Sequence, residues 1–109
     1  MTVVVPWPVR DLWRNNKPHW AAEARAKKKA RALTYYAALN AKVSAGENIT
    51  VTFHPPDKRR RDRDNMIAAI KGHLDGLSDA LGIDDSRFNL KFEFGDVQPR
   101  NGEVHFDVS

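Results

Sequence analysis

A short charged stretch, residues 54–65, carries the side chains best suited to chemistry. It reads His-Pro-Pro-Asp-Lys-Arg-Arg-Arg-Asp-Arg-Asp-Asn. A run of four cations is suited to holding phosphate, whereas Asp62 and Asp64 are suited to holding a hard cation such as Mg²⁺, which prefers oxygen ligands. A basic run alone would predict a solvated loop, and an aspartate pair alone would predict a helix cap. Together they indicate a site for phosphate-ester chemistry.

A second acidic pair, Asp84-Asp85, could contribute to the same reaction. Phosphodiester hydrolysis needs a cation that activates water and neutralises the charge that builds on the phosphate oxygens. Lys71 falls two helical turns after Asp64, on the same face, and could add charge near the scissile phosphate. Simpler readings remain open, because either Asp62 or Asp64 could cap a helix and Asp84-Asp85 could form a polar turn.

The basic residues around these acids are candidates for contact with DNA. Within the charged stretch they are Lys58, Arg59, Arg60, Arg61 and Arg63. Arg14 and Lys17 are further candidates, in a predicted loop over residues 9–18 beside Trp13. A surface loop pinned by a buried tryptophan is the alternative there. More cations crowd the first half of the next predicted helix, where a solvated polar face is the alternative. They are Arg25, Lys27, Lys28, Lys29 and Arg31.

The overall composition sets limits on the class of protein. A length of 109 residues predicts a single domain over 1–109. The apolar fraction of 41% is typical of a globular chain rather than a disordered one, and the net charge of +4 suits a nucleic-acid partner. The chain has no cysteine, which excludes disulfides and thiolate chemistry. We expect no signal peptide, no membrane span, no small-molecule substrate and a cytoplasmic location.

The periodicity of apolar residues predicts an α/β (α+β) fold with the order β-α-β-α-β-β. Alternation predicts strands over residues 2–5, 48–53, 88–94 and 104–108, the last two forming a hairpin around a turn at 99–102. Good helix formers predict helices over 19–45 and 64–81, each ended by a glycine. Such an order places a mixed sheet under two helices.

Each predicted helix has an apolar face. Spacings of four, three and four place residues of the first helix on one face: Ala26, Ala30, Leu33 and Ala37. The stripe of the second helix consists of Met66, Ile70, Leu74, Leu77 and Leu81. His73 falls within that stripe, which predicts a packing histidine with satisfied hydrogen bonds rather than a ligand.

These residues resemble the RusA family of bacterial and phage Holliday junction resolvases, also called crossover junction endodeoxyribonucleases. The likeness covers most of the chain and is strongest over residues 54–86. It is carried by Arg59-Arg60-Arg61-Asp62-Arg63-Asp64-Asn65, by Lys71 with Leu74-Asp75-Gly76-Leu77, by Gly82-Ile83-Asp84-Asp85, and by the early Pro6-Trp7-Pro8.

The resemblance implies a homodimeric, Mg²⁺-dependent endonuclease, with Mn²⁺ as a substitute, that cuts four-way DNA junctions symmetrically in recombination and repair. The catalytic aspartates of the family fall on Asp62, Asp64 and Asp85, with Asp84 adjacent as a further metal ligand. One position departs from the family, because Ala68 stands where the founding member has a functional lysine. Lys71 keeps the spacing to Leu74-Asp75, and we assign the role to it.

The predicted length of the second helix indicates how the acids could be combined. At about 1.5 Å per residue, residues 64–81 span roughly 25 Å, whereas Mg²⁺ holds its ligands at about 2.1 Å. Two antiparallel copies of this helix across a two-fold axis could instead join Asp62 and Asp64 of one chain to the partner's Asp85. Alternatives are a DNA-binding relative without cleavage activity, and a nuclease for forked or flap DNA.

Overall fold

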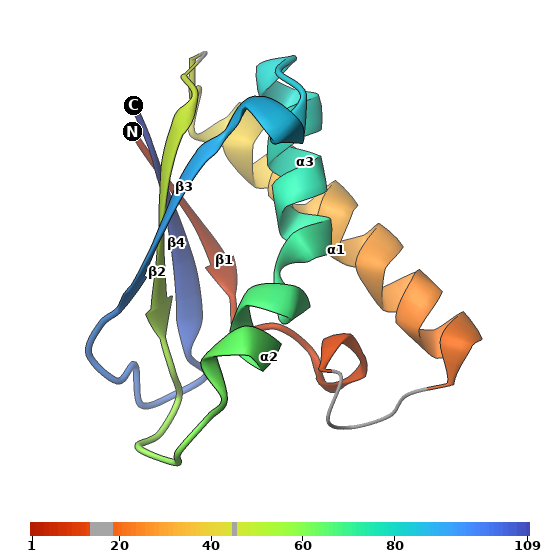
Figure 1. The fold of residues 1–109 in the computed structure, drawn as a ribbon, viewed down its shortest axis with the longest axis vertical. Helices are drawn as coiled ribbons and strands as arrows, with labels where there is room; N and C mark the ends of the chain where they lie inside the picture. The colour runs from red at the N-terminus through yellow and green to blue at the C-terminus, as the bar shows by residue number, and fades with distance from the viewer. Residues whose placement is uncertain (14–18, 45) are drawn as a thin grey trace.

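A four-stranded mixed sheet forms one layer, and the helices cover one of its faces (Figure 1). The computed structural model describes residues 1–13, 19–44 and 46–109. The strands are β1 (Thr2–Pro6), β2 (Asn48–His54), β3 (Asn89–Phe94) and β4 (Glu103–Val108). The helices are α1 (Trp20–Asn40), α2 (Arg63–Ala69) and α3 (Lys71–Leu81), with short 3-10 turns η1 (Arg10–Leu12) and η3 (Asp85–Arg87). This arrangement confirms the predicted fold class.

The order of strands in the sheet is β1-β4-β2-β3, so the predicted hairpin between the last two strands is wrong. The last strand, β4, runs antiparallel to both β1 and β2, whereas β3 pairs in parallel with β2. Val104, Phe106 and Val108 are all buried, which suits a strand with a neighbour on each side. Leu90 and Phe94 remain 40% and 37% exposed, which suits an edge strand. The helical crossover through α2 and α3 returns the chain in the direction that parallel pairing requires.

The second predicted helix is broken at Ile70 into α2 and α3. The Ile70 amide donates to the Ile67 carbonyl at 3.3 Å. This bond reaches three residues back, as in a 3-10 turn, rather than four residues back, as in an α-helix. Ile70 is fully buried. The break turns the chain so that both pieces bury apolar side chains, Met66 from α2 and Leu74 and Leu77 from α3. The predicted stripe is therefore the core-facing side, although it does not lie on one straight helix.

The first helix packs closely against α3 through two glycines. A Cβ on Gly76 would collide with the Arg31 carbonyl oxygen, and a Cβ on Gly72 would lie 3.0 Å from the Lys27 carbonyl oxygen. The buried face of α1 differs from the prediction after Ala30, because Thr34 and Ala38 are buried, whereas Leu33 is 45% exposed and Ala37 is half-buried. The buried residues are Ala26, Ala30, Thr34 and Ala38. Small side chains on this face allow the close approach of the two helices.

The first helix ends earlier than predicted, at Asn40 rather than Ala45, and Ala45 lies outside the described residues. Lys42 takes a left-handed conformation with φ of 53°, and the Val43 amide donates to the Ala38 carbonyl at 3.2 Å. This bond closes the last turn in the manner of a helix C-terminal motif. Across the described ranges, no helix combines the length and apolar character that crossing a bilayer would require.

Candidate nucleic-acid interface and acidic groove

The loop between β2 and α2, residues 55–62, is organised around the Asp57 carboxylate. Asp57 Oδ1 accepts from the Arg59 amide and from Arg61 Nη2, each at 2.9 Å. The Arg59 amide is the main cause of a lowered pKa for the Asp57 carboxyl, and Arg61 adds to it. A charged acceptor at this point fixes the backbone of the basic run in a turn.

The three arginines of this loop have different surroundings. Only 16% of the Arg61 side chain is exposed. Its Nη1 donates to the carbonyls of Asp57 and Arg59, and its guanidinium lies over the Trp7 ring. Lys58, Arg59 and Arg60 are exposed. The predicted DNA-binding set therefore divides into Arg61, which fixes the loop, and its neighbours, which are presented to solvent.

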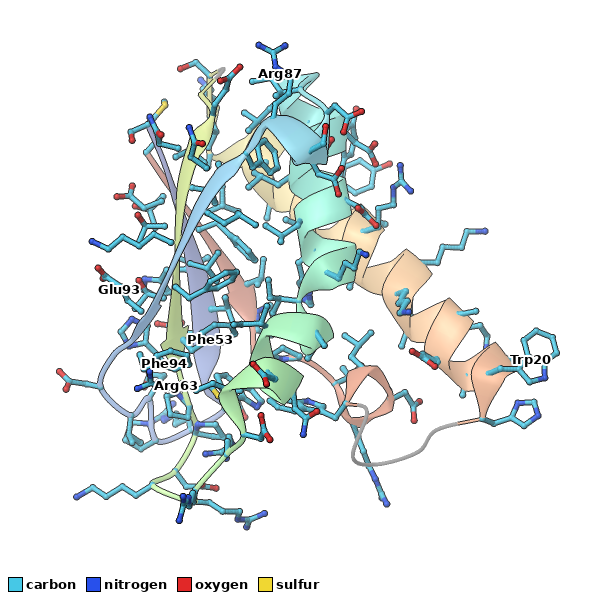
Figure 2. The ribbon with its side chains drawn as sticks, viewed as in Figure 1. Trp20, Phe53, Arg63, Arg87, Glu93 and Phe94 are labelled. Carbon is cyan, nitrogen blue, oxygen red and sulfur yellow. The ribbon has the colours of Figure 1, made fainter. Side chains whose placement is uncertain are left out.

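Arg63, the first residue of α2, lies against the edge strand of the sheet. Its guanidinium carbon is 4.3 Å from the centroid of the Phe94 ring, and Figure 2 shows the two side chains side by side near Phe53. Such a cation–π contact joins α2 to β3. Arg63 remains exposed, so its charge is still available at the surface.

A polar cleft of about 240 Å³ lies beside the basic loop. Its lining combines three guanidinium groups with an amide, a carboxylate and two indoles: Arg59, Arg60, Arg61, Asn65, Asp62, Trp7 and Trp13. The two indoles stack with centroids 5.8 Å apart. Guanidinium groups are suited to phosphate, which they can hold by paired hydrogen bonds. Among the described residues, this cleft gathers the groups best suited to a phosphate of a nucleic-acid backbone.

Asp62 and Asp64 have separate roles in the structure. Asp62 is the N-cap of α2, because its Oδ1 accepts from the amides of Asp64 at 2.8 Å and Asn65 at 3.4 Å. The sequence left open which of the two caps the helix, and the structure assigns the cap to Asp62. Asp62 lines the polar cleft, whereas the exposed Asp64 lines a different hollow. The start of α2 therefore separates the two carboxylates.

That second hollow is a groove of about 390 Å³ between the helices and β3, here called the acidic groove. Its polar lining residues are Asp64, Lys71 and Asp85, and apolar groups form the remainder: Ile67, Ala68, Leu74, Leu90 and Phe92. The prediction that Asp64 and Lys71 share a face is confirmed despite the break at Ile70. The groove also includes Asp85 from the second acidic pair.

The second acidic pair divides in a similar way. Asp84 Oδ1 accepts from the Ser86 amide at 2.9 Å, which caps η3 and lowers the pKa of the Asp84 carboxyl. The pKa of Asp85 is raised, first by hydrogen bonding with Asp84, then by partial desolvation and by the charge of Asp75. Asp84 therefore fits the alternative of a polar turn. Asp85 lines the acidic groove close to other carboxylates, and a cation bound there would offset the repulsion between them.

The described residues of one chain do not group the acids into a metal site. Nowhere in residues 1–13, 19–44 and 46–109 do three His, Asp or Glu side chains come together closely enough to hold an ion. Figure 1 shows why, because α2 and the η3 turn lie at opposite ends of the helical layer. Carboxylates are the right donor type for Mg²⁺, but one chain does not bring enough of them to one point.

Two predicted DNA-binding residues, Arg14 and Lys17, lie outside the described residues. Three residues after Lys17 in the sequence, the structure shows an aromatic group, Trp20, that the sequence did not single out. Trp20 is 76% exposed and points away from the start of α1 (Figure 2), and its ring lies tilted against that of His19 with the ring centroids 5.6 Å apart. An exposed aromatic ring beside cations can stack on an unpaired base. The sequence did offer a signal for this residue, because Trp20 stands at the start of a helix rich in lysine and arginine.

The prediction of a satisfied packing histidine is only partly correct for His73. The side chain is 2% exposed and its ring stacks near that of Phe106, with centroids 6.3 Å apart. Its Nδ1 has no hydrogen-bond partner among the described residues. Burial lowers the pKa of His73 to about 4, so the ring is neutral at pH 7. The residue packs as expected but retains an unused polar atom.

Comparison with known proteins adds one relative. An uncharacterized protein of Xylella fastidiosa (strain Temecula1 / ATCC 700964) is 36% identical over 94 residues, which is 80% of this chain and 61% of the relative. The chain therefore spans about three-fifths of the length of the curated relative that it matches. No protein-family model matches the chain.

Proposed function

We propose that this protein is a RusA-type, Mg²⁺-dependent endodeoxyribonuclease that resolves four-way DNA junctions as a homodimer. Its substrate is branched DNA, and its place of action is the cytoplasm of a bacterial cell or phage-infected host, where that DNA lies. The reaction is hydrolysis of a phosphodiester bond, in the service of recombination and repair.

One observation carries the proposal: the start of α2 lies between the polar cleft and the acidic groove. Asp62 lines the cleft with three arginines, and Asp64 lines the groove with Lys71 and Asp85. DNA held by the arginines would lie next to carboxylates on both sides of the helix start. A structural capping motif alone would need only Asp62, and it would not need Asp64, Lys71 and Asp85 to line one groove.

The proposed homodimer would supply the additional carboxylate ligands that the described residues of one chain do not bring to one point. The acidic groove runs along the α2–α3 side of the molecule and is bordered by the exposed edge strand β3. A second chain placed antiparallel along it would bring the partner's Asp85 toward Asp62 and Asp64. Mg²⁺, when bound there, would neutralise charge on the phosphate and activate water. The role of Lys71 is to add positive charge at the groove, and a two-fold axis would produce two such sites.

The experiment is a cleavage assay on synthetic four-way junctions, forks and linear duplex, with and without Mg²⁺. We expect symmetric cuts in four-way junctions that require the cation and are absent from linear duplex. Preferential cutting of forks or flaps would favour the alternative nuclease class. Tight junction binding without cleavage, in either Mg²⁺ or Mn²⁺, would identify a DNA-binding relative and overturn the proposal.

A further inference from the structure

A cavity of about 480 Å³ shares the lining residue Trp7 with the polar cleft. It is partly open to solvent and is bordered by residues 6–9, η1 and one face of α1, and its walls are mainly apolar. Trp7, Leu12, Ala26 and Leu33 contribute to these walls. The volume is in the range of cavities that hold a small organic group. Neither the acidic groove nor the capping acids use this space.

One buried polar group, His73, lies at this cavity. Its side chain is 2% exposed, it contributes to the cavity lining, and its Nδ1 lacks a partner among the described residues. A buried polar atom without a hydrogen bond costs free energy. The Nδ1 atom itself is closed off from the cavity, so the His73 ring contributes a packing surface and a spectroscopic reporter rather than a hydrogen bond.

The rim of the cavity carries charge of mostly one sign. Arg25 and Lys29 lie four residues apart on α1, so they face the same side of the helix. Asp11, from η1, also contributes to the lining. Two cations against one carboxylate favour a ligand with an anionic part outside the apolar interior.

We propose that this cavity binds the base of a single unpaired nucleotide, with its phosphate at Arg25 and Lys29. A planar base suits the apolar walls, where its faces can pack beside the His73 ring. Trp7 lines both this cavity and the polar cleft, so a strand could pass its indole and place the adjoining phosphate at Arg59 and Arg60. The strand-binding part rests on the proposed function, because it requires a branched DNA that presents an unpaired nucleotide at the crossover.

Free nucleotides test the cavity without DNA cleavage. The ring ¹⁵N resonances of the four histidines are recorded while dAMP, dCMP, dGMP or dTMP is added, and deoxyribose 5-phosphate serves as a probe that lacks a base. We expect a nucleoside monophosphate to shift the His73 ring signals and deoxyribose 5-phosphate to leave them unchanged. A His73→Gln variant identifies the signals by their loss. If no nucleotide shifts them, the proposal is wrong.

Two alanines of α1 provide a matched pair of variants. Ala22 is half-buried and lines the cavity, whereas Ala24 is exposed and does not. Leucine favours helix at both positions, so both variants should remain folded. Ala22→Leu should fill the mouth of the cavity and abolish the His73 shift, and Ala24→Leu should preserve it. An unchanged shift in Ala22→Leu would place nucleotide binding elsewhere.

The DNA arm compares two four-way junctions that differ by one base. Each carries one unpaired nucleotide at the crossover, and in the second junction that nucleotide lacks its base. Loss of the base contacts should weaken binding by about tenfold, and the difference should vanish in Ala22→Leu. Equal affinities in the unmodified protein would overturn the strand-binding part. Cleavage of a fully paired junction is measured separately. Absence of cleavage would count against the proposed function, whereas equal affinities for the two unpaired-nucleotide junctions would count against this cavity alone.

Discussion

The guanidinium carbon of Arg61 lies 5.4 Å from the centroid of the Trp7 ring. The same guanidinium donates to Asp57, so one side chain joins the basic loop to the segment that follows β1. Arg61 therefore acts as a structural link, whereas Arg59 and Arg60 extend from a loop that is already fixed. This difference separates the roles of three consecutive arginines.

The first prediction concerns DNA affinity. Replacing Arg59 and Arg60 with alanine should weaken junction binding and make its salt dependence shallower. The slope of log affinity against log salt should change by about 0.9 for each phosphate contact that is lost on B-DNA. Fluorescence anisotropy across a series of salt concentrations measures both effects.

Arg87 and Lys91 provide a control with the same loss of charge. Both lie away from the polar cleft, Arg87 pairs with Glu47, and Lys91 pairs with Glu93. The Arg87→Ala/Lys91→Ala variant should keep the original slope. Equal slopes for the two double variants would show that the basic loop has no special contact with DNA.

The second prediction concerns the acids. Asn in place of Asp62, Asp64 or Asp85 should abolish Mg²⁺-dependent junction cleavage while junction binding is retained. Each change removes a charge that would hold the cation. Asn caps helices about as well as Asp, so Asp62→Asn should keep the thermal stability of the protein, whereas Asp62→Ala should lower it by about 1 kcal/mol. Junction cleavage by Asp64→Asn at the original rate would contradict the assignment.

The third prediction concerns the shared site. Each shared site would take Asp62 and Asp64 from one chain and Asp85 from its partner. In a heterodimer of one Asp64→Asn chain and one Asp85→Asn chain, both substitutions therefore fall in the same site, and the second site should be intact. Such heterodimers should nick junctions without coordinated resolution. Differently tagged chains allow the heterodimer to be purified, and each homodimeric variant serves as the inactive control. Inactive purified heterodimers would show that the sites are not shared in this way.

The fourth prediction follows from the buried ring of His73. Its folded-state pKa of about 4 lies below the ordinary value of 6.5, so the unfolded chain binds a proton first as the pH falls. The contribution of His73 to stability should be complete above pH 6.5 and should be lost between pH 6.5 and about 4. Between about pH 7 and about pH 5 the loss is on the order of 2 kcal/mol.

Urea unfolding at these two pH values measures that loss. His73→Leu removes the titrating group and should make stability less dependent on pH over the same interval. The other histidines are shared by both proteins, so the difference between the two curves isolates His73. Parallel curves would indicate that the ring is more accessible than the structure shows.

The fifth prediction concerns the packing of α1 on α3. Gly76→Ala should lower the free energy of unfolding by about 3 kcal/mol, because the new Cβ meets the Arg31 backbone rather than a movable side chain. Gly72→Ala should cost less, since its Cβ would lie 3.0 Å from the Lys27 oxygen. Thermal unfolding compares the two. Equal stabilities for both variants would contradict the close helix contact.

The sequence by itself determined where the strands and helical segments lie and which side of most of them faces inward. Period-two alternation located β2 and β4, because half-buried strands bury every second side chain. The stripe from Met66 to Leu77 located the buried face of α2 and α3, and Gly82 marked their end with a φ of 67°. The spacing of seven residues between Asp64 and Lys71 correctly placed both on one face.

Tertiary structure decided the strand order, the helix break and the roles of individual charges. Sequence periodicity carries no information about which strands are neighbours, so the local turn signal at 99–102 favoured a hairpin that β4 does not form. The two acids on either side of Arg63 are equivalent candidates in the sequence, and only the backbone path makes Asp62 the cap and places Asp64 in the groove. Likewise, only packing brings Asp57 and Trp7 to Arg61 and leaves the Nδ1 of His73 without a partner among the described residues.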